Sequence, residues 1–419
     1  MPFLREHPLF RSFRYRNYRL FFAGQTVSMT GTWMQVIAVG WLVYRMTGSA
    51  MALGLVSFAG QIPTFLLPPF TGVLVDRWDR RRCLLITQTL SMFQAFVLAT
   101  IVLTGRATIP FLILLSVLMG IINAFDIPLR QSFTQDIVHR PEDLGNAIAL
   151  NASIVNGSRL IGPSVAGLLI AAWGEGICFL LNGISYLAVL IALAAMTAIR
   201  AKPERSHPLF RQEFIEGFRH TFGFLPLRNI LLLLTLISIV GVFFPVLMPI
   251  IVTTIPGGGP RTMGFLMAGS GLGALAAVVM IGSRKSAVGL ERRIPFAAAA
   301  FGVGYVFFSF SRQFWPSFFL MAWNGFFFAT FLASSNTVLQ TLADEEKRGR
   351  VLSFYTMAFM GMAPVGSLLA GMLAHRIGAP RAILTAGVCC CLSALLYMKN
   401  FRAVHEAAHV VYRRKGLLS

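Results

Sequence analysis

The sequence has few charged residues, and acidic ones are the scarcest. Asp, Glu, Lys and Arg make up 12% of the 419 residues, which is roughly half the share of an ordinary soluble protein. Histidine and cysteine are also sparse, and we find no phosphate-binding Walker loop and no serine-nucleophile elbow. The 7 histidines lie in loops, tails or the ends of apolar segments. We therefore expect no enzyme activity, no metal site and no bound cofactor.

Long apolar segments dominate what is present. Hydrophobic residues make up 56% of the chain, and they come in blocks of about 20, long enough to cross a hydrocarbon core of ~30 Å as helices. The blocks do not alternate as β-barrel strands would. We predict an all-α polytopic membrane protein with twelve transmembrane helices. The spans lie near residues 18–44, 50–75, 83–104, 108–132, 143–173, 177–198, 228–252, 263–283, 294–311, 315–341, 350–375 and 380–399.

The basic residues predict the orientation. Most Lys and Arg fall in the N-terminus, the even-numbered connections and the C-terminal tail, and few fall in the odd-numbered connections. Because cytoplasmic loops are enriched in Lys and Arg, we expect both termini in the cytoplasm and the first span to act as the insertion signal. The net charge of +20 is explained by this bias, so we predict no nucleic-acid binding.

The two halves of the chain repeat each other. The sequence HPLFR occurs at 7–11 and at 207–211. Five glycines of the first half recur 204 residues later, and they are Gly145, Gly157, Gly162, Gly167 and Gly174. Two parallel six-helix repeats around a central cavity are an architecture of alternating-access transporters. We expect bundles at 1–199 and 228–399, a cytoplasmic linker at 200–227 with an amphipathic helix at 210–222, and a basic cytoplasmic tail at 400–419.

Two motifs resemble those of the major facilitator superfamily. GVLVDRWDRRR at 72–82 is similar to the superfamily signature between helices 2 and 3, and GSRLIGPSVAG at 157–167 is similar to the helix-5 motif of its antiporters. The run from Asp126 to Pro163 resembles the bacterial subgroup with the enterobactin exporter and macrolide-efflux proteins. The antiporter motif would comprise Gly157, Gly162, Pro163 and Gly167.

The resemblance implies a cytoplasmic gate formed by Gly72, Asp76, Arg77, Arg80 and Arg81. In the family, the loop carboxylate, here Asp76, is thought to bind the N-terminus of helix 11, which begins near Gly349. A helix N-terminus attracts an anion. For the arginines, an equal alternative to a role in the gate is that they are present only because cytoplasmic loops are enriched in basic residues.

Asp126 is the one acidic residue that we place within the hydrocarbon core. At 1.5 Å per helical residue it lies ~27 Å from the external end of span 4, and Arg159 of span 5 lies at a similar depth of ~21 Å. Arg130 follows one turn later on the same face. Two interpretations remain open: a structural ion pair with Arg130 or Arg159, or a carboxylate that carries the transported proton while Arg159 and Arg130 set its proton affinity.

Polar stripes predict a cavity lined by spans 1, 4 and 10. Positions on spans 1 and 4 fall within about 80° of one helix face at 100° per residue. Lipid disfavours unpaired charges, so these stripes should face water. The expected lining residues are Gln25, Ser28, Thr32, Gln35, Asn123, Asn156, Asn324, Phe328, Phe331 and Ser335. A polar half facing an aromatic half suits a large amphipathic substrate.

Together these features favour a secondary transporter. We expect a monomeric exporter of drug-, macrolide- or siderophore-type molecules in a bacterial inner membrane, driven by the proton gradient. The alternatives are an importer or facilitator of a small metabolite, and a non-transporting sensor or lipid scramblase of the same fold. The intact polar stripes and the Gly72–Arg82 loop favour transport over sensing.

The proposed gate gives a direct test. Asp76→Asn should cripple transport while the protein still inserts, because an amide anchors a helix N-terminus less strongly than a carboxylate. Transport in membrane vesicles, with the amount of inserted protein measured in parallel, checks this. Normal efflux by the variant would exclude this role for Asp76.

Overall fold

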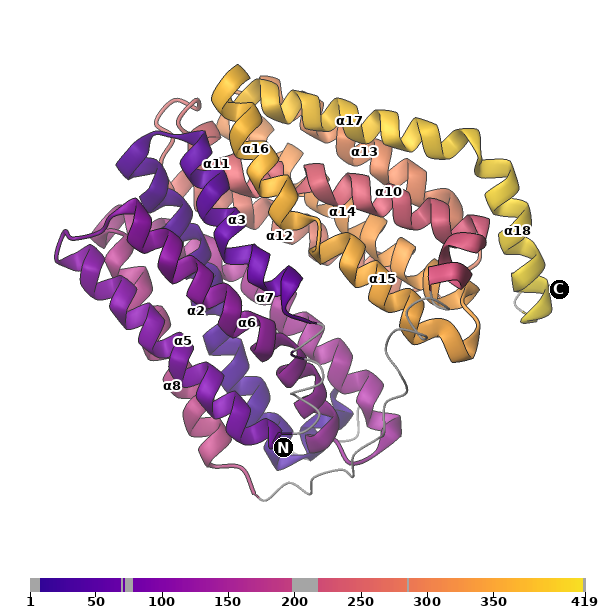
Figure 1. Cartoon of the computed structure of the whole chain (residues 1–419), viewed down its shortest axis with the longest axis horizontal. Helices are drawn as coiled ribbons and strands as arrows, with labels where there is room; N and C mark the ends of the chain where they lie inside the picture. Colours follow the sequence, from indigo (N-terminus) through magenta and orange to yellow (C-terminus); the bar gives the residue numbers. More distant parts are fainter. Residues whose placement is uncertain (1–7, 69–70, 72–77, 198–217, 285, 417–419) are drawn as a thin grey trace. The chain divides into compact units, whose positions relative to one another are not determined.

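The structure is a computed structural model, which describes residues 8–68, 71, 78–197, 218–284 and 286–416 (Figure 1). Within these residues every regular element is a helix. Eleven helical segments are long and apolar enough to cross a membrane, and the shorter apolar helix α3 (Ala50–Leu66) occupies the remaining predicted span. The all-α polytopic fold is confirmed.

The first of two compact units contains most of the N-terminal half. It comprises Met1–Gly48, Ala59–Arg205 and Gly259–Ala268. Its elements are η1 (Pro8–Arg14), α2 (Arg16–Thr47), α5 (Arg80–Leu103), α6 (Ile109–Ile137), α7 (Pro141–Trp173) and α8 (Glu175–Ala194), with parts of α3 and α12. Buried aromatic side chains such as Tyr18, Phe21 and Phe133 join α2 to α6.

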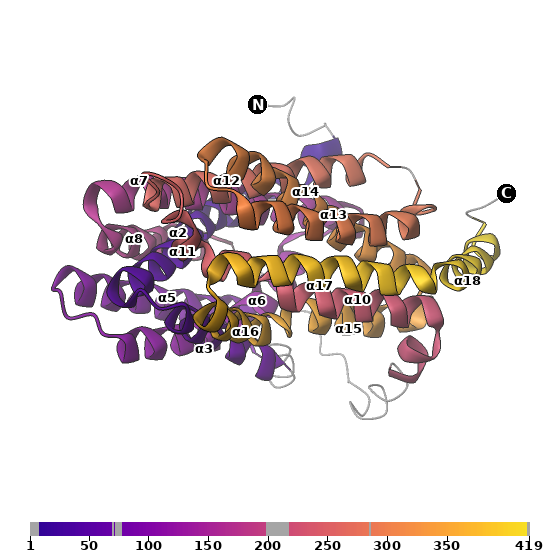
Figure 2. The same ribbon diagram turned by 90° about the horizontal axis from the view of Figure 1, so that it is seen from above.

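The second unit contains most of the C-terminal half. It comprises Ser49–Phe58, Ser206–Gly258 and Gly269–Ser419. Its elements are α10 (Leu225–Gly241), α11 (Phe243–Val252), most of α12 (Pro260–Gly282), α13 (Leu290–Phe310), α14 (Phe314–Leu342), η2 (Glu345–Lys347), α15 (Arg348–Met360), α16 (Ala363–Ile377), α17 (Ala379–Lys399) and α18 (Phe401–Arg414). The predicted basic tail thus contains a further helix, α18, which leaves the end of α17 at a bend (Figures 1 and 2).

One predicted span is broken in a way the sequence explains. The segment 228–252 is divided into α10 and α11 at Val242. Pro245 has no N–H to donate to the carbonyl of Gly241, four residues earlier. The hydroxyl of Tyr305 on α13 donates to that carbonyl instead, at 2.8 Å. Tyr305 of the neighbouring helix therefore supplies the hydrogen bond that the carbonyl of Gly241 does not receive from Pro245.

Two of the glycine pairs that revealed the repeat occupy equivalent structural positions. Gly174 and Gly378 both follow the fifth span of their half, with φ of 81° and 86°, a region in which only glycine is unstrained. A Cβ on Gly167 would lie 3.1 Å from Cα of Gly264, and one on Gly371 would lie 2.8 Å from Cα of Gly54. In both halves, span 5 of the repeat therefore touches another helix backbone to backbone.

The domain boundaries remain predictions. The linker residues 198–217, and with them most of the predicted amphipathic helix at 210–222, lie outside the described residues.

His220, just after these residues, lies 3.8 Å from Asp344. Burial lowers the pKa of His220 and Lys347 lowers it further, while Asp344 raises it.

A close helix contact provides a stability test. A Cβ on Gly325 of α14 would lie 1.9 Å from the carbonyl oxygen of Ser270 on α12, so Gly325→Ala must push the helices apart. We expect Gly325→Ala to cost ~1–3 kcal/mol, as overpacking does, and to lower the unfolding midpoint in detergent. Gly349→Ala is the matched control, because nothing lies within 4 Å of its added Cβ. Equal midpoints for the two variants would contradict the packing argument.

Candidate functional site

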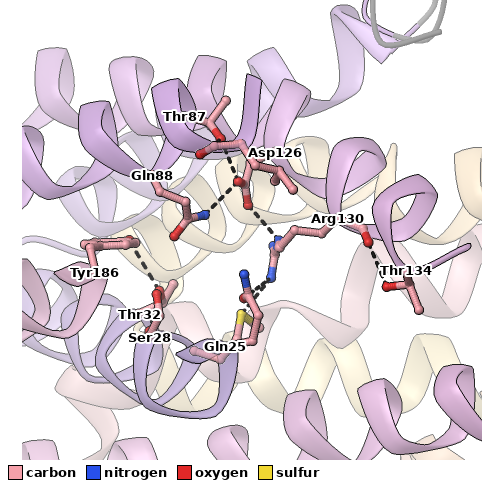
Figure 3. A network of polar contacts seen from close by, with 11 residues as sticks. Gln25, Ser28, Thr32, Thr87, Gln88, Asp126, Arg130, Thr134 and Tyr186 are labelled. Atoms are coloured by element: carbon pink, nitrogen blue, oxygen red, sulfur yellow. Dashed lines mark hydrogen bonds and ion pairs between the residues drawn. The ribbon is translucent and has the colours of Figure 1, made fainter. Parts of the chain in front are cut away.

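A buried carboxylate lies at the centre of unit 1. Asp126 is in the C-terminal half of α6, and only 4% of its surface is exposed. Figure 3 shows it between the polar side chains of α5 on one side and Arg130 on the other. The structure therefore buries a charge at the position for which the sequence predicted one.

Both oxygens of Asp126 have partners. Thr87 Oγ1 and Gln88 Nε2 of α5 donate to Oδ1 at 2.9 and 2.7 Å. Arg130 Nε lies 2.7 Å from Oδ2 and forms the ion pair. A buried carboxylate without a counter-charge costs several kcal/mol, so this triple contact is what allows the charge to remain on α6.

Arg130 reaches from α6 to α2. Its Nη1 contacts the thioether of Met29 at 2.9 Å and Gln25 Oε1 at 3.5 Å. Gln25 is buried. The guanidinium is thus held firmly by the carboxylate and weakly by α2, because thioether sulfur is a poor acceptor. Gln25, predicted to line the cavity, and Arg130, predicted to set the proton affinity of Asp126, therefore meet here.

Arg159 has a different partner from the expected one. Its guanidinium lies over the indole ring of Trp33 on α2, 5.6 Å from the ring centroid. This is cation–π geometry. The sequence left either Arg130 or Arg159 open as the ion-pair partner of Asp126. The structure shows the pair with Arg130, which lies four residues later on the same helix.

The C-terminal part of the polar stripe on α2, at Thr32 and Gln35, joins α2 to neighbouring helices. Gln35 Nε2 donates to Gln94 Oε1 at 3.0 Å, and Asn182 Nδ2 donates to Gln35 Oε1 at 2.8 Å. Thr32 and Tyr186 place their hydroxyls 3.4 Å apart (Figure 3). These bonds connect α2 to α5 and α8. Gln35, predicted to line the cavity, instead uses both its amide nitrogen and its amide oxygen in hydrogen bonds to other helices.

The other predicted lining residues of unit 1 differ in how far they are buried. Ser28 is buried beside Gln25 on α2, and Asn123 is half-buried on α6. Asn156 is half-buried on α7, where its amide donates to the carbonyl of Ala152 at 2.9 Å. The structure therefore does not bring Asn156 into the Asp126 network.

The predicted residues of α14 lie inside unit 2. Asn324, Phe331 and Ser335 are buried, and a Cβ on Gly304 of α13 would lie 2.2 Å from Asn324 Oδ1. Phe328 contacts the ring of Phe301 at a centroid distance of 5.0 Å. The side-chain polar atoms of Asn324 and Ser335 make no hydrogen bond within the described structure, so they retain hydrogen-bonding capacity.

Two of the five predicted gate residues, Arg80 and Arg81, lie within the described residues. Gly72, Asp76 and Arg77 lie outside the described residues. Arg80 Nη1 contacts both carboxylate oxygens of Asp136 at 2.8 and 3.0 Å. Arg81 donates to the carbonyls of Leu193 and Ala194 at the C-terminus of α8, where a cation is favoured. These two arginines therefore connect the N-terminus of α5 to the C-terminal ends of α6 and α8.

The antiporter-like motif acts mainly in packing. A Cβ on Gly162 would lie 2.6 Å from Cβ of Trp33 on α2, and one on Gly264 would lie 2.4 Å from the carbonyl oxygen of Pro163. Gly167 makes the backbone contact described above. Nothing lies within 4 Å of a Cβ on Gly157. Gly162, Pro163 and Gly167 thus let other helices approach α7, and Gly157 does not.

Sequence reasoning missed the α5 side of the site. Thr87, Gln88, Ser91 and Gln94 are all buried on α5. Thr87, Ser91 and Gln94 are spaced at i, i+4 and i+7, the one-face pattern of a helix. The criterion that identified the stripes on spans 1 and 4 would have found span 3 as well.

A second group of ionisable side chains lies in unit 2. Glu291, His405 and His409 place potential ligand atoms within 4.8 Å of one another. The sequence analysis did not identify this group. The signal was HEAAH at 405–409, whose H-E-x-x-H spacing puts two imidazoles on one helical face.

Comparison with known proteins identifies relatives over nearly the whole chain. A family model described as transmembrane secretion effector matches residues 8–414. The staphyloferrin A transporter of Staphylococcus aureus is 27% identical, covering 91% of this chain and 96% of that protein. Macrolide efflux protein A of Streptococcus pyogenes is 24% identical, covering 89% and 94%.

Solved structures share the fold. A bacterial homologue of the lysosomal transporter Spinster superposes with a TM-score of 0.71 at 15% identity, covering 94% of this chain and 98% of that one. The nucleoside transporter NupG gives 0.73 at 11% identity, covering 92% and 98%. At these identities the likeness to the two transporter structures concerns the fold alone.

The ion pair predicts an order of stability among variants. Arg130→Gln leaves the Asp126 carboxylate uncompensated, and we expect a loss of ~3–5 kcal/mol. The double variant Asp126→Asn with Arg130→Gln should recover much of it, because no buried charge remains. Thermal midpoints in detergent measure both. Arg159→Gln is the control of equal chemistry, and a larger loss for it than for Arg130→Gln would contradict the assignment of the pair.

Proposed function

The chain belongs to the transmembrane secretion effector family of the major facilitator superfamily, and on that premise we propose that it exports amphipathic small molecules across a bacterial inner membrane by proton antiport. The observation that carries the proposal is the ion pair between Asp126 and Arg130 within α6. Buried ionisable residues in membrane spans are costly, and they commonly mark ion or proton pathways.

The direction of transport is supported by the relatives. A siderophore transporter, a macrolide efflux protein and the multidrug efflux pump Tap of Mycolicibacterium fortuitum each match most of this chain. Two of the three are named for efflux. Their named substrates suit a polar and aromatic lining better than a site for a sugar or an inorganic ion, so we extend export of amphipathic molecules to this chain.

The contacts of Asp126 suggest how a proton would act. While Asp126 is ionised, it attracts Arg130, and Thr87 and Gln88 donate to its other oxygen. A proton on Oδ2 removes the charge that holds the guanidinium and replaces an acceptor with a donor. Arg130 then retains only its weak contacts to Met29 and Gln25 on α2. Proton binding therefore frees Arg130, which sits among the polar residues of α2 that we assign to the substrate path.

The roles of the other groups follow from their contacts. Thr87 and Gln88 hold the carboxylate on α5 in either protonation state, since a hydroxyl and an amide bind a carboxyl or a carboxylate. Arg159, stacked on Trp33, keeps a second positive charge in unit 1. In unit 2, the uncommitted polar atoms of Asn324 and Ser335 are the groups that we propose for substrate contact.

Coupling can be separated from binding. In inside-out vesicles, where export appears as uptake, Asp126→Asn should abolish pH-gradient-driven accumulation of a labelled macrolide or of staphyloferrin A. Exchange of preloaded against external substrate should persist, because the amide keeps the shape and the bonds to α5. Glu142→Gln, an exposed acidic residue of α7, is the control and should transport as the unaltered protein does.

Two results would contradict the proposal. Proton-driven accumulation by Asp126→Asn at the unaltered rate would exclude Asp126 as the proton carrier. Transport in the opposite direction, insensitive to an uncoupler, would favour a facilitator.

A further inference from the structure

A buried glutamate faces two histidines at the end of unit 2, outside the site described above. Glu291 is the second residue of α13, and its side chain has no exposed surface. α18 packs through Val404, Ala408 and Tyr412, each fully buried and four residues apart. His405 directly follows Val404 in the sequence, and His409 directly follows Ala408. Both imidazoles therefore lie beside the packed face of α18.

The three ligand groups converge. His405 Nδ1 lies 3.1 Å from Glu291 Oε1, and His409 Nε2 lies 3.8 Å from the same oxygen. The two imidazole centroids are 4.0 Å apart. A tetrahedral ion with bonds of ~2.0–2.2 Å separates its ligand atoms by about 3.3–3.6 Å. The observed separations lie on either side of this range, so small side-chain rotations suffice to close the site.

From this geometry we infer that Glu291, His405 and His409 form a binding site for a divalent transition cation of the Zn²⁺ class. Two imidazoles and one carboxylate are the donor set that such ions favour over Mg²⁺ or Ca²⁺, which prefer oxygen ligands. Three protein ligands leave a fourth position for water. The ion joins α18 to the start of α13.

The charges around the cluster support a cation. A carboxylate without exposed surface requires a compensating charge, which a bound cation supplies. The exposed Arg292 places Nη2 3.2 Å from His405 Nε2. Because a guanidinium only donates, that nitrogen accepts and Nδ1 carries the proton shared with Glu291. A bound cation displaces this Nδ1 proton, and Arg292 turns toward solvent as the tautomer changes.

Tyr412 orients the carboxylate. Its hydroxyl donates to Glu291 Oε2 at 3.3 Å, the oxygen that the histidines do not contact. Hydrogen bonds of this kind to a ligating carboxylate fix its direction.

The site has a mechanical consequence for the tail. Beyond the cluster, Lys415 Nζ donates to the carbonyls of Thr341 and Ala343 at the end of α14. The metal would add a second attachment, one helical turn before Tyr412. Occupancy of the site therefore controls how firmly α18 is held on unit 2.

Metal titration of the full-length protein tests the inference. The protein is purified in detergent with its affinity tag removed, and Zn²⁺ is added in competition with a chromogenic chelator. We expect one equivalent to bind, and His405→Ala with His409→Ala to abolish it. Tyr412→Phe should weaken binding ~10-fold or more, as loss of an orienting hydrogen bond does. Glu406→Gln, on the exposed residue between the histidines, is the matched control and should bind as the unaltered protein does.

A second readout covers the tail and the competing thiols. Zn²⁺ should slow tryptic cleavage after Arg402, Arg413 and Arg414, and should not do so in the double histidine variant. Co²⁺ absorbance distinguishes nitrogen and oxygen ligands from the free cysteines such as Cys83 and Cys389. An absence of saturable binding, binding that survives in the double variant, or thiolate absorbance would each overturn the inference.

Discussion

Polar groups within a bilayer have no water to bind, so they must find partners within the protein. This constraint explains the interior of unit 1. Asn182, Gln35 and Gln94 form a chain of amide hydrogen bonds across three helices, and Gln94 ends it at the carbonyl of Leu115. The same requirement places Tyr305 on the carbonyl freed by Pro245, and it collects three donors around Asp126.

Much of the fold follows from the sequence because apolar length and glycine spacing are local signals. The spans, the repeat and the burial of Asp126 could all be predicted, and so could the Arg130 partner, which lies one turn away on the same helix. Partners on other helices could not be fixed. Arg159 was expected at a depth similar to that of Asp126, but depth alone does not distinguish a carboxylate from the indole ring of Trp33 as its partner. The rotation of each helix decides that contact.

Two other contacts show the limit of one-helix reasoning. Thr87 and Gln88 were available to the stripe criterion, yet only the packing of α5 on α6 directs them to Asp126. Glu291 and His405 are more than a hundred residues apart, and the fold of the tail brings them together. His405 and His409 were nevertheless visible as a pair, since their spacing is that of one helical turn.

The unequal contacts of Arg130 set an energy scale for the proposed cycle. Moving one elementary charge through 100 mV supplies ~2.3 kcal/mol, whereas separating a fully buried ion pair costs ~3–5 kcal/mol. A single proton would barely drive such a separation if the carboxylate were left bare. The hydroxyl of Thr87 and the amide of Gln88 remain on the carboxyl after the guanidinium departs, and thereby act as a fixed solvent shell. In the proposed cycle they lower the work that this separation requires.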